Sequence, residues 1–307
     1  MSGFRCGLAC LVGRPNAGKS TLANALVGTK IAITSSRPQT TRHVIRGVVN
    51  RPEAQIVLLD TPGLHKPRTL LGQRLNDAVR DAWAHVDVAA LCIAADAPVG
   101  PGDGFVARAL SRARPRGATT FAVVTKTDAV APAIVAERLV EVADLGARVG
   151  IEWEQVVPVS ALAGNQVDLL TDLVIAALPE GPPLYPDGEV TDEPEEVLVA
   201  ELIREAALEG VSDELPHSIA VVVEEMGLRE GRSEESPLVD IHAIVFVERD
   251  SQKAIVIGKG GSRLKHVGTT ARRGIEALLG TPVFLDLRVK VAKDWQRDPR
   301  QLRRLGF

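Results

Sequence analysis

The segment from Gly13 to Ser20, with the sequence GRPNAGKS, restricts the possible folds of this chain more than any other stretch. It fits the pattern G-x-x-x-x-G-K-[S/T], in which Gly13 and Gly18 let the backbone turn so that successive N–H groups converge on a phosphate. Lys19 is expected to bind the β- and γ-phosphates of a nucleotide, and the Ser20 hydroxyl to ligate Mg²⁺. The predicted phosphate site consists of Gly13, Arg14, Pro15, Asn16, Ala17, Gly18, Lys19, Ser20 and Thr21.

The first half of the chain alternates between strand and helix patterns. Strands are expected at residues 5–12, 43–50, 55–60, 88–94, 119–124 and 155–159. Helices are expected at residues 19–27, 70–85, 103–114, 132–146 and 166–178. This alternation predicts an α/β fold with a mostly parallel sheet and helices on both faces. Ligands of such sheets bind at the carboxyl ends of the strands, where the Gly13–Ser20 loop lies.

The chain is expected to form two domains joined by a linker. Residues 1–180 form the phosphate-loop domain, and residues 181–194, rich in Pro, Gly and acidic side chains, have the composition of a linker. Residues 195–307 are expected to form a smaller α+β domain. Its predicted elements are helices at 195–209 and 262–279, strands at 218–226, 239–248 and 283–293, and a Gly-rich turn at 258–261.

Composition indicates a globular protein whose charge is unevenly distributed. Of the 307 residues, 45% are hydrophobic and 24% are charged, and no apolar run approaches the length of a membrane span. The three cysteines lie in apolar, strand-like stretches, which favours reduced, buried thiols in a cytosolic protein. Residues 187–214 contain eleven acidic side chains and one base, whereas residues 250–307 contain 13 Lys and Arg against five Asp and Glu. The basic end predicts an anionic partner.

Two further segments complete a predicted magnesium and γ-phosphate site. Asp60 ends an apolar run and can hold Mg²⁺ through water, while the Gly63 N–H can approach the γ-phosphate. Thr40 and Thr41 lie in the polar stretch before the second strand, and Thr41 is preferred over Thr40 as a Mg²⁺ ligand. A bound nucleoside triphosphate is expected to order residues 34–42 and 62–74. The predicted switch residues are Thr40, Thr41, Asp60, Thr61, Pro62, Gly63 and Leu64, and the predicted Mg²⁺ ligands are Ser20, Thr41 and Asp60.

The sequence TKTD at residues 125–128 follows a predicted strand and indicates guanine recognition. Asp128 is placed to accept two hydrogen bonds from guanine, and Lys126 to cover the ring. Adenine lacks those donors and would leave a buried Asp128 unpaired, which argues against an ATP-using enzyme. Thr125 stands where guanine-binding loops usually begin with Asn. The predicted base site consists of Thr125, Lys126, Thr127 and Asp128, with Ser160, Ala161 and Leu162 offering a backbone N–H to the guanine oxygen.

Leu64 predicts slow intrinsic hydrolysis. It occupies the position after Gly63, where Ras-like enzymes carry the glutamine that orients the attacking water, and leucine cannot form that hydrogen bond. The alternative is that the attacking water is positioned by other means. Asn16 in the phosphate loop is a hypothetical ligand for a monovalent cation such as K⁺, which would act as a charge in place of an arginine finger.

The basic end contains the sequence IGKGG at residues 257–261, which fits the I-G-x-x-G pattern of a KH domain. In such domains the G-x-x-G loop joins two helices and clamps the backbone of about four nucleotides. The predicted RNA-binding residues are Gly258, Lys259, Gly260, Gly261, Arg263 and Lys265. The arginines of the tail, from Arg297 to Arg304, recur at about helical spacing and suit either phosphate contacts or a solvated face.

With these motifs in order, the chain resembles the Era family of bacterial GTPases over nearly its whole length. The matching stretches are GRPNAGKS, ITSSRPQTTRH at 33–43, DTPGLH at 60–65, VIGKGG at 256–261, KHVG at 265–268 and VKVAKDWQRDPRQLRRLGF at 289–307. The resemblance implies a P-loop GTPase domain followed by a type II KH domain, with GTP or GDP and Mg²⁺ as ligands. It also implies binding near the 3′ end of 16S ribosomal RNA, assistance to 30S subunit assembly, and a monomer in the cytoplasm that associates loosely with the inner face of the cell membrane.

Two other functions remain open at this point. An RNA-modification GTPase also carries a hydrophobic residue after the D-x-x-G glycine, but it should have a catalytic or cofactor cluster, and none is visible in residues 187–307. An RNA-binding scaffold with a weakly active nucleotide site is disfavoured by Lys19, Ser20 and Asp60.

Overall fold

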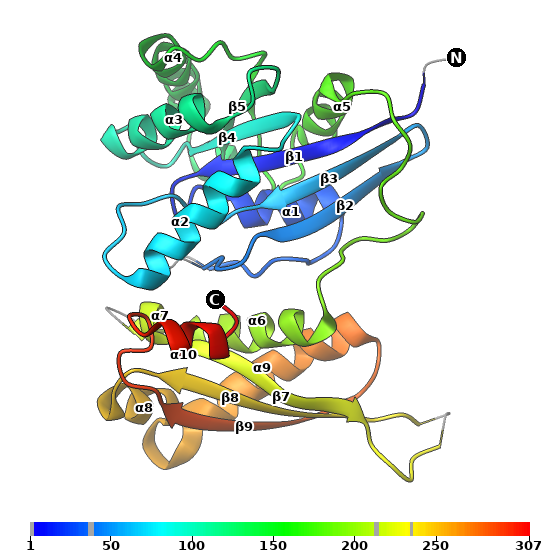
Figure 1. Ribbon diagram of the computed structural model, residues 1–307, viewed down its shortest axis with the longest axis vertical. Helices are drawn as coiled ribbons and strands as arrows, with labels where there is room; N and C mark the ends of the chain where they lie inside the picture. Colours follow the sequence, from blue (N-terminus) through cyan, green and yellow to red (C-terminus); the bar gives the residue numbers. More distant parts are fainter. Residues whose placement is uncertain (1–2, 36–39, 212–214, 234–235) are drawn as a thin grey trace. The chain divides into compact units, whose positions relative to one another are not determined.

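The computed structural model describes residues 3–35, 40–211, 215–233 and 236–307. The chain divides into two compact units, which are described separately here (Figure 1). The first is built mainly from residues up to Asp192, and the second mainly from Glu193–Phe307. Within the described residues, no helix combines the length and the apolar character that crossing a membrane requires.

A six-stranded sheet with the order β2-β3-β1-β4-β5-β6 forms the centre of the first unit. Its strands are β1 (Arg5–Gly13), β2 (Ile45–Arg51), β3 (Ala54–Asp60), β4 (Val88–Ala94), β5 (Thr119–Thr125) and β6 (Val156–Pro158). Every pairing is parallel except that of β2 with β3, which form an antiparallel hairpin. The predicted mostly parallel sheet is therefore confirmed.

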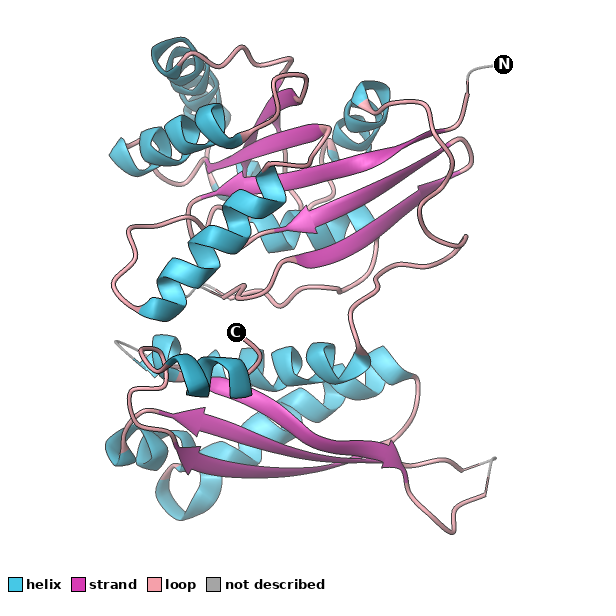
Figure 2. Ribbon diagram, in the orientation of Figure 1, coloured by secondary structure: helices cyan, strands magenta, loops and turns pink. Residues whose placement is uncertain are grey.

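Helices cover both faces of this sheet (Figure 2). One face packs against α1 (Lys19–Val27) and α5 (Val167–Ala177), and the other against α2 (Leu70–Trp83), α3 (Pro101–Ala113) and α4 (Pro132–Val149). Successive side chains of a strand point to opposite faces, so in β1 Leu11 joins the first core and Val12 the second. Burial on both faces explains why the strand patterns are continuous apolar runs rather than alternating ones.

The strand order brings the polar strand ends together at one edge of the sheet. Strand β1 lies between β3 and β4, so the chain passes to one side of β1 through α1 and to the other side through α2. Such a reversal opens a crevice at the carboxyl ends of the strands. Gly13, Asp60, Ala94 and Thr125, the last residues of β1, β3, β4 and β5, all lie at this edge.

Residues 181–192, whose composition predicts a linker, lie along the β2 side of the sheet. The Val48 N–H donates to the Val190 oxygen at 2.9 Å, and the Asn50 amide donates to the Glu189 oxygen at 2.8 Å. The buried Gln55 carbonyl accepts from the backbone N–H groups of Leu184 and Tyr185 at 2.8 and 2.9 Å. This segment, termed the strap below, is therefore held by specific hydrogen bonds within the first unit.

The second unit contains a three-stranded sheet with the order β7-β8-β9. Strand β7 (Ala220–Leu228) pairs antiparallel with β8 (Val239–Val247), which pairs parallel with β9 (Val283–Val291). Helices α6 (Glu195–Leu208) and α9 (Ser262–Leu279) pack on each other and on the sheet, and the remaining helices are α7 (Leu215–Ser218), α8 (Asp250–Ile257) and α10 (Pro299–Arg304). The predicted α+β architecture is confirmed.

Several local expectations for the second unit differ from the structure. The strand expected from Ser218 begins at Ala220, because Leu215–Ser218 forms a helical turn. Helix α8 was not anticipated: its eight residues, DSQKAIVI, are too few to display a clear amphipathic period. Helix α10 is also absent from the expected elements, although Asp298 caps it by accepting from the Arg300 N–H at 2.8 Å.

Candidate functional site

The phosphate loop connects β1 to α1 with a backbone that turns sharply. Asn16 and Gly18 have φ angles of 63° and 79°, and Lys19 is the first residue of the helix. The helix N-terminus therefore faces the loop, and its free N–H groups suit an anion. Lys19 is buried, and its ammonium donates to the Arg14 oxygen at 2.9 Å. Burial lowers the pKa of Lys19, although attraction to Asp60 opposes that effect.

Three oxygen-bearing side chains from distant parts of the sequence meet beside this loop. The Ser20 hydroxyl donates to Asp60 Oδ2 at 2.6 Å and lies 2.8 Å from Thr41 Oγ1, which also donates to Asp60 Oδ2 at 3.4 Å. Two hydroxyls and a carboxylate form a hard-oxygen set of the kind that Mg²⁺ prefers. The second carboxylate oxygen, Oδ1, is buried and has no hydrogen-bond partner among the described residues, so the set fits a cation.

Asp60 has an unusual electrostatic environment. It is fully buried at the end of β3, and burial raises its pKa above the usual carboxyl range. Attraction to Lys19 and the hydrogen bonds from Ser20 and Thr41 act in the opposite direction. A cation at this position would favour the ionised carboxylate.

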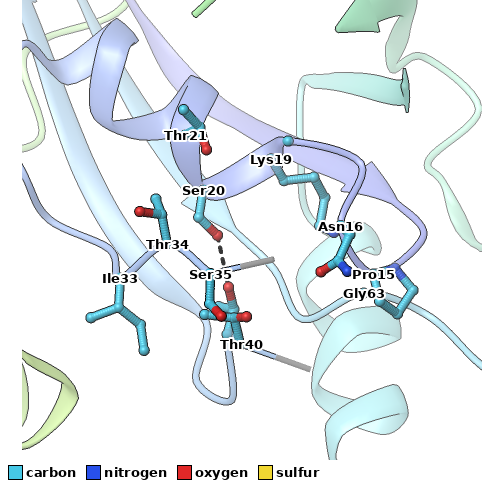
Figure 3. A pocket seen from close by; sticks show the side chains of 12 residues that line it. Pro15, Asn16, Lys19, Ser20, Thr21, Ile33, Thr34, Ser35, Thr40 and Gly63 are labelled. Carbon is cyan, nitrogen blue, oxygen red and sulfur yellow. Dashed lines mark hydrogen bonds between the residues drawn. The ribbon is translucent and has the colours of Figure 1, made fainter. Parts of the chain in front are cut away.

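The two segments predicted to respond to nucleotide flank these oxygens. Ser20, Thr34, Ser35 and Thr40 all line one pocket, as Figure 3 shows. Gln39 and residues 36–38 lie outside the described part of the chain. Thr41, preferred over Thr40 in the sequence analysis, contacts both Ser20 and Asp60.

The Asp60–Leu64 segment packs against the phosphate loop, with Gly63 next to Pro15. A Cβ atom on Gly63 would lie 2.4 Å from the Pro15 nitrogen, so only glycine fits there. The Thr61 hydroxyl donates to the Leu11 oxygen at 2.7 Å, which ties the segment to β1. Leu64 is buried in the core beneath α2, where it presents no polar group to the nucleotide site.

The structure also brings the residues of the predicted guanine site together. Ser160, at the end of β6, is fully buried and donates to Asp128 Oδ1, and it accepts from the Ala163 N–H at 3.1 Å. Lys126 forms an ion pair with Asp96 Oδ2 at 2.8 Å. The Thr125 hydroxyl donates to the Ala17 oxygen of the phosphate loop at 2.8 Å.

The expectation that Asp128 is buried is wrong for the protein by itself. Asp128 is exposed, as is Leu162, whose relative exposure is 81%. The reason is that Asp128 lies in a short 3₁₀ turn, Thr127–Ala129, beyond the end of β5, where its carboxylate accepts a hydrogen bond from Ser160. Burial of this carboxylate would have to come from a bound base.

Two acidic residues at the site were not identified from the sequence. Asp96, just after β4, pairs with Lys126, and Asp103, in the first turn of α3, pairs with Arg14 at 3.2 Å. Asp103 also accepts from the Gly100 N–H at 2.9 Å and so caps its own helix. The position of Asp96 at the carboxyl end of a predicted strand was a usable signal, whereas nothing local marks the distant pairing of Asp103.

In the second unit, the glycine-rich turn joins α8 to α9. Gly258, Gly260 and Gly261 have φ angles of 73°, 59° and 79°, which side-chain-bearing residues rarely adopt. A groove of about 700 Å³ begins at this turn and runs between α9 and β9. Its lining includes Gly261, Leu264, Lys265, Gly268, Thr269 and Arg272 on one side and Val283, Phe284, Leu285 and Leu287 on the other. The groove is lined by apolar side chains together with the basic residues Lys265 and Arg272.

Arg263, predicted to bind RNA, is half-buried and hydrogen-bonded to backbone oxygens. Its guanidinium donates to the Ala207 oxygen at 3.2 Å and to the Glu209 oxygen at 2.7 Å, at the end of α6. It therefore caps the α6 carbonyls and fixes the turn against that helix. Lys265 lines the groove instead, and Lys259 lies within the turn.

Comparison with known proteins gives the same two-part division. Residues 8–126 match the family described as 50S ribosome-binding GTPase, and residues 214–296 match the KH domain. The GTPase Era of Streptomyces coelicolor is 66% identical over 303 residues, which cover 99% of this chain and 95% of that protein. The chain belongs to the Era GTPase family. The GTPase Era of Mycobacterium tuberculosis is 62% identical over 307 residues, the full length of both proteins.

Two solved Era structures share the fold over 99% of both chains. A point variant of Aquifex aeolicus Era bound to GDP·AlF4⁻ is 36% identical, with a TM-score of 0.91. Era in complex with MgGDPNP and nucleotides 1506–1542 of 16S ribosomal RNA is 37% identical, with a TM-score of 0.92. The P-loop GTPase and KH architectures predicted from the sequence are those of Era proteins.

Proposed function

We propose that this protein is a GTP-hydrolysing switch that binds 16S ribosomal RNA through its KH domain and assists assembly of the 30S subunit. The observation that carries the proposal is the convergence of Ser20, Thr41 and Asp60 beside Lys19, in a chain that also contains the Gly258–Gly261 turn and its groove. Relatives with both features are Era GTPases, and one solved neighbour holds a GTP analogue and a 16S segment.

In the proposed reaction, the protein binds the triphosphate but provides little activation of the attacking water. Lys19 and the loop N–H groups would bind the β- and γ-phosphates, and Ser20, Thr41 and Asp60 would hold Mg²⁺, whose positive charge would stabilise negative charge on the phosphates. The Gly63 N–H approaches the γ-phosphate. Leu64 is buried and cannot orient water, which supports slow intrinsic turnover.

Guanine specificity is assigned to Asp128. Its carboxylate would accept from the N1–H and the exocyclic amine of guanine, while Ser160 holds it in orientation. A bound base would bury the carboxylate, so adenine would leave it unpaired and bind poorly. Lys126 would cover the ring, and a backbone N–H of the Ser160, Ala161 and Leu162 segment would reach the guanine oxygen.

The KH groove is assigned to single-stranded RNA. Lys259 and Lys265 would contact phosphates, and Gly258, Gly260 and Gly261 would allow the sugar-phosphate backbone to approach closely. The apolar side chains of Leu264, Leu285 and Leu287 in the groove lining suit unstacked bases. Arg263 acts indirectly, because its hydrogen bonds hold the turn to α6.

The cellular setting is also part of the proposal. A domain of residues 1–180, a connecting segment of 181–194 and an RNA-binding domain of 195–307 would act in a cytoplasmic monomer. Loose contact with the inner face of the cell membrane follows only from the family resemblance. The RNA-modification alternative is disfavoured, because the match to Era GTPases extends over nearly the whole chain.

The proposal is tested by replacing Lys19 with alanine. Because Lys19→Ala removes the charge that faces the phosphates, GTP binding should be lost, while Lys30→Ala, outside the predicted site, should bind like the unmodified protein. The Lys19→Ala protein should still bind a 16S 3′-end fragment, but GTP should no longer change that affinity. Undiminished GTP binding by Lys19→Ala would exclude the proposed nucleotide site.

We further propose that Asn16 provides a ligand for K⁺. The residue has a left-handed backbone conformation and lines the phosphate pocket, where a monovalent cation could offset charge on the triphosphate. GTP hydrolysis should be at least several-fold faster in K⁺ than in Na⁺ buffer of equal ionic strength, and Asn16→Ala should remove the difference. Equal rates in both salts with the unmodified protein would refute this assignment.

A further inference from the structure

The first residue of the guanine loop, Thr125, makes a contact that suggests how the base is read. Its hydroxyl donates to the Ala17 oxygen at 2.8 Å, and the Ile93 oxygen lies 3.4 Å away. Thr125 is 4% exposed, and it is the last residue of β5, 108 positions away from Ala17 in the sequence. This bond joins the base-binding loop directly to the phosphate loop.

Packing leaves the Thr125 side chain little freedom to turn elsewhere. A Cβ atom on Gly18 would lie 3.3 Å from the Thr125 hydroxyl oxygen, 3.4 Å from its Cβ and 3.8 Å from its methyl carbon. The whole side chain therefore lies against Gly18 of the phosphate loop. Rotation toward a bound base would give up a buried hydrogen bond and this contact together.

The hydrogen-bonding groups of guanine can be compared with those that the protein has available, given that the Thr125 hydroxyl is already bonded to Ala17. Guanine presents donors at N1 and N2, and acceptors at O6 and N7. Asp128 can satisfy the donors, but N7 requires a donor from the protein. A threonine hydroxyl has a single proton, which the Ala17 oxygen already receives, so Thr125 could donate to N7 only by giving up that bond.

We propose that Thr125 is a positioning residue that braces the phosphate loop, and that the protein reads guanine without a hydrogen bond to N7. The inference rests on the proposed GTP site and specifies its base readout. Asp128 then carries the specificity for N1 and N2, and Thr125 contributes to affinity equally for every nucleotide that occupies the phosphate loop.

The test compares GTP with 7-deaza-GTP, in which a C–H group replaces N7. The full-length protein should bind both with dissociation constants within about a factor of two. Inosine triphosphate, which lacks the N2 amine, should bind roughly tenfold more weakly, because Asp128 loses one charge-assisted hydrogen bond. A tenfold or greater weakening with 7-deaza-GTP would overturn the proposal.

Two variants test the brace. Thr125→Val is nearly isosteric but has no hydroxyl, so it should weaken GTP and 7-deaza-GTP by the same factor, on the order of tenfold. Thr125→Ser keeps the hydroxyl and should bind both nucleotides within about threefold of the unmodified protein. Unchanged binding by Thr125→Val, or a loss confined to GTP, would overturn the brace. Failure of the unmodified protein to bind any of these nucleotides would refute the proposed function itself.

Discussion

Some ionisable side chains of this protein are buried where little water can solvate their charge. Asp60 is the clearest case, because burial raises the pKa of its carboxyl group while one of its oxygens has no partner among the described residues. Such a group is costly in a nucleotide-free protein and becomes favourable when a cation binds. The residue therefore links magnesium, nucleotide and proton binding.

Replacing Asp60 with asparagine should weaken Mg²⁺-dependent GTP binding roughly 10- to 100-fold. The reason is that the side chain expected to hold Mg²⁺ through water loses its negative charge. Since the pKa of Asp60 is raised in the free protein, Mg²⁺ must displace a proton at low pH, and GTP affinity should rise as pH increases through that pKa. Titration of a fluorescent GTP analogue at several pH values and Mg²⁺ concentrations measures both effects. Asp81→Asn is the exposed control, and a variant Asp60→Asn that kept the full Mg²⁺ dependence would contradict the assignment.

The buried tryptophans offer a matched pair for hydrogen-bond energetics. Trp295 is fully buried and its indole N–H donates to the Ser218 oxygen at 2.9 Å, whereas the equally buried Trp83 N–H has no partner among the described residues. Both substitutions to phenylalanine lose packing, but Trp295→Phe also loses a hydrogen bond. Chemical unfolding should therefore show a larger loss of stability for Trp295→Phe, by about 1 kcal/mol. Equal losses for the two variants would contradict this account.

At the scale of elements, the strap shows how polar contacts give an irregular segment a defined path. Gln55 and β2 hold its backbone, and Asp192 accepts from the Tyr185 hydroxyl at 2.7 Å and from Arg46 at 3.0 Å. Strand β2 follows the Thr40–Thr41 segment and is the edge strand that the strap covers. Covering an edge strand in this way also prevents it from pairing with another chain.

The strap contacts predict a pH-dependent stability difference. Burial by itself raises the pKa of Asp192, but the hydrogen bonds from Tyr185 and Arg46 outweigh it and lower the pKa below its usual value. The ionised carboxylate therefore stabilises the fold above the unfolded-state pKa of about 3.9, and this contribution is lost as pH falls through the lower folded-state value.

Asp192→Asn should accordingly be less stable than the unmodified protein at pH 7, and the difference should shrink below about pH 4. Urea unfolding across this range measures it. Asp187→Asn, in the same segment and exposed, is the control and should show little difference at any pH. A deficit for Asp192→Asn that grows as the pH falls would rule out the argument.

At the scale of the whole molecule, the proposed function requires that GTP and RNA binding influence one another. A ligand shifts a conformational equilibrium only by its difference in affinity for the two states, and the coupling between two ligands is reciprocal. If GTP changes the dissociation constant of a 16S 3′-end fragment by some factor, that RNA should change the dissociation constant of GTP by the same factor. Calorimetric titrations in both orders measure the two factors. Factors of one in both titrations would show that the two sites are independent and would contradict the switch.

Much of this protein could be predicted from local sequence, because its chemistry depends on short patterns. The GRPNAGKS loop, the Asp60–Gly63 segment and the IGKGG turn each contain the residue types that their backbone conformations demand. The spacing of apolar residues also predicts the order of strands and helices in the first unit. The reason is that burial of one or both faces of an element determines which of its positions are apolar. These features require no knowledge of distant contacts.

Only the tertiary structure decided which distant side chains meet. It joins Thr41 to Ser20 and Asp60, Thr125 to Ala17, and Arg263 to the end of α6, and it leaves Asp128 exposed. It also shows a proline-rich stretch hydrogen-bonded along β2. The physical reason is that periodicity records whether a residue is buried, whereas its partner depends on strand order and on how loops approach across the edge of the sheet.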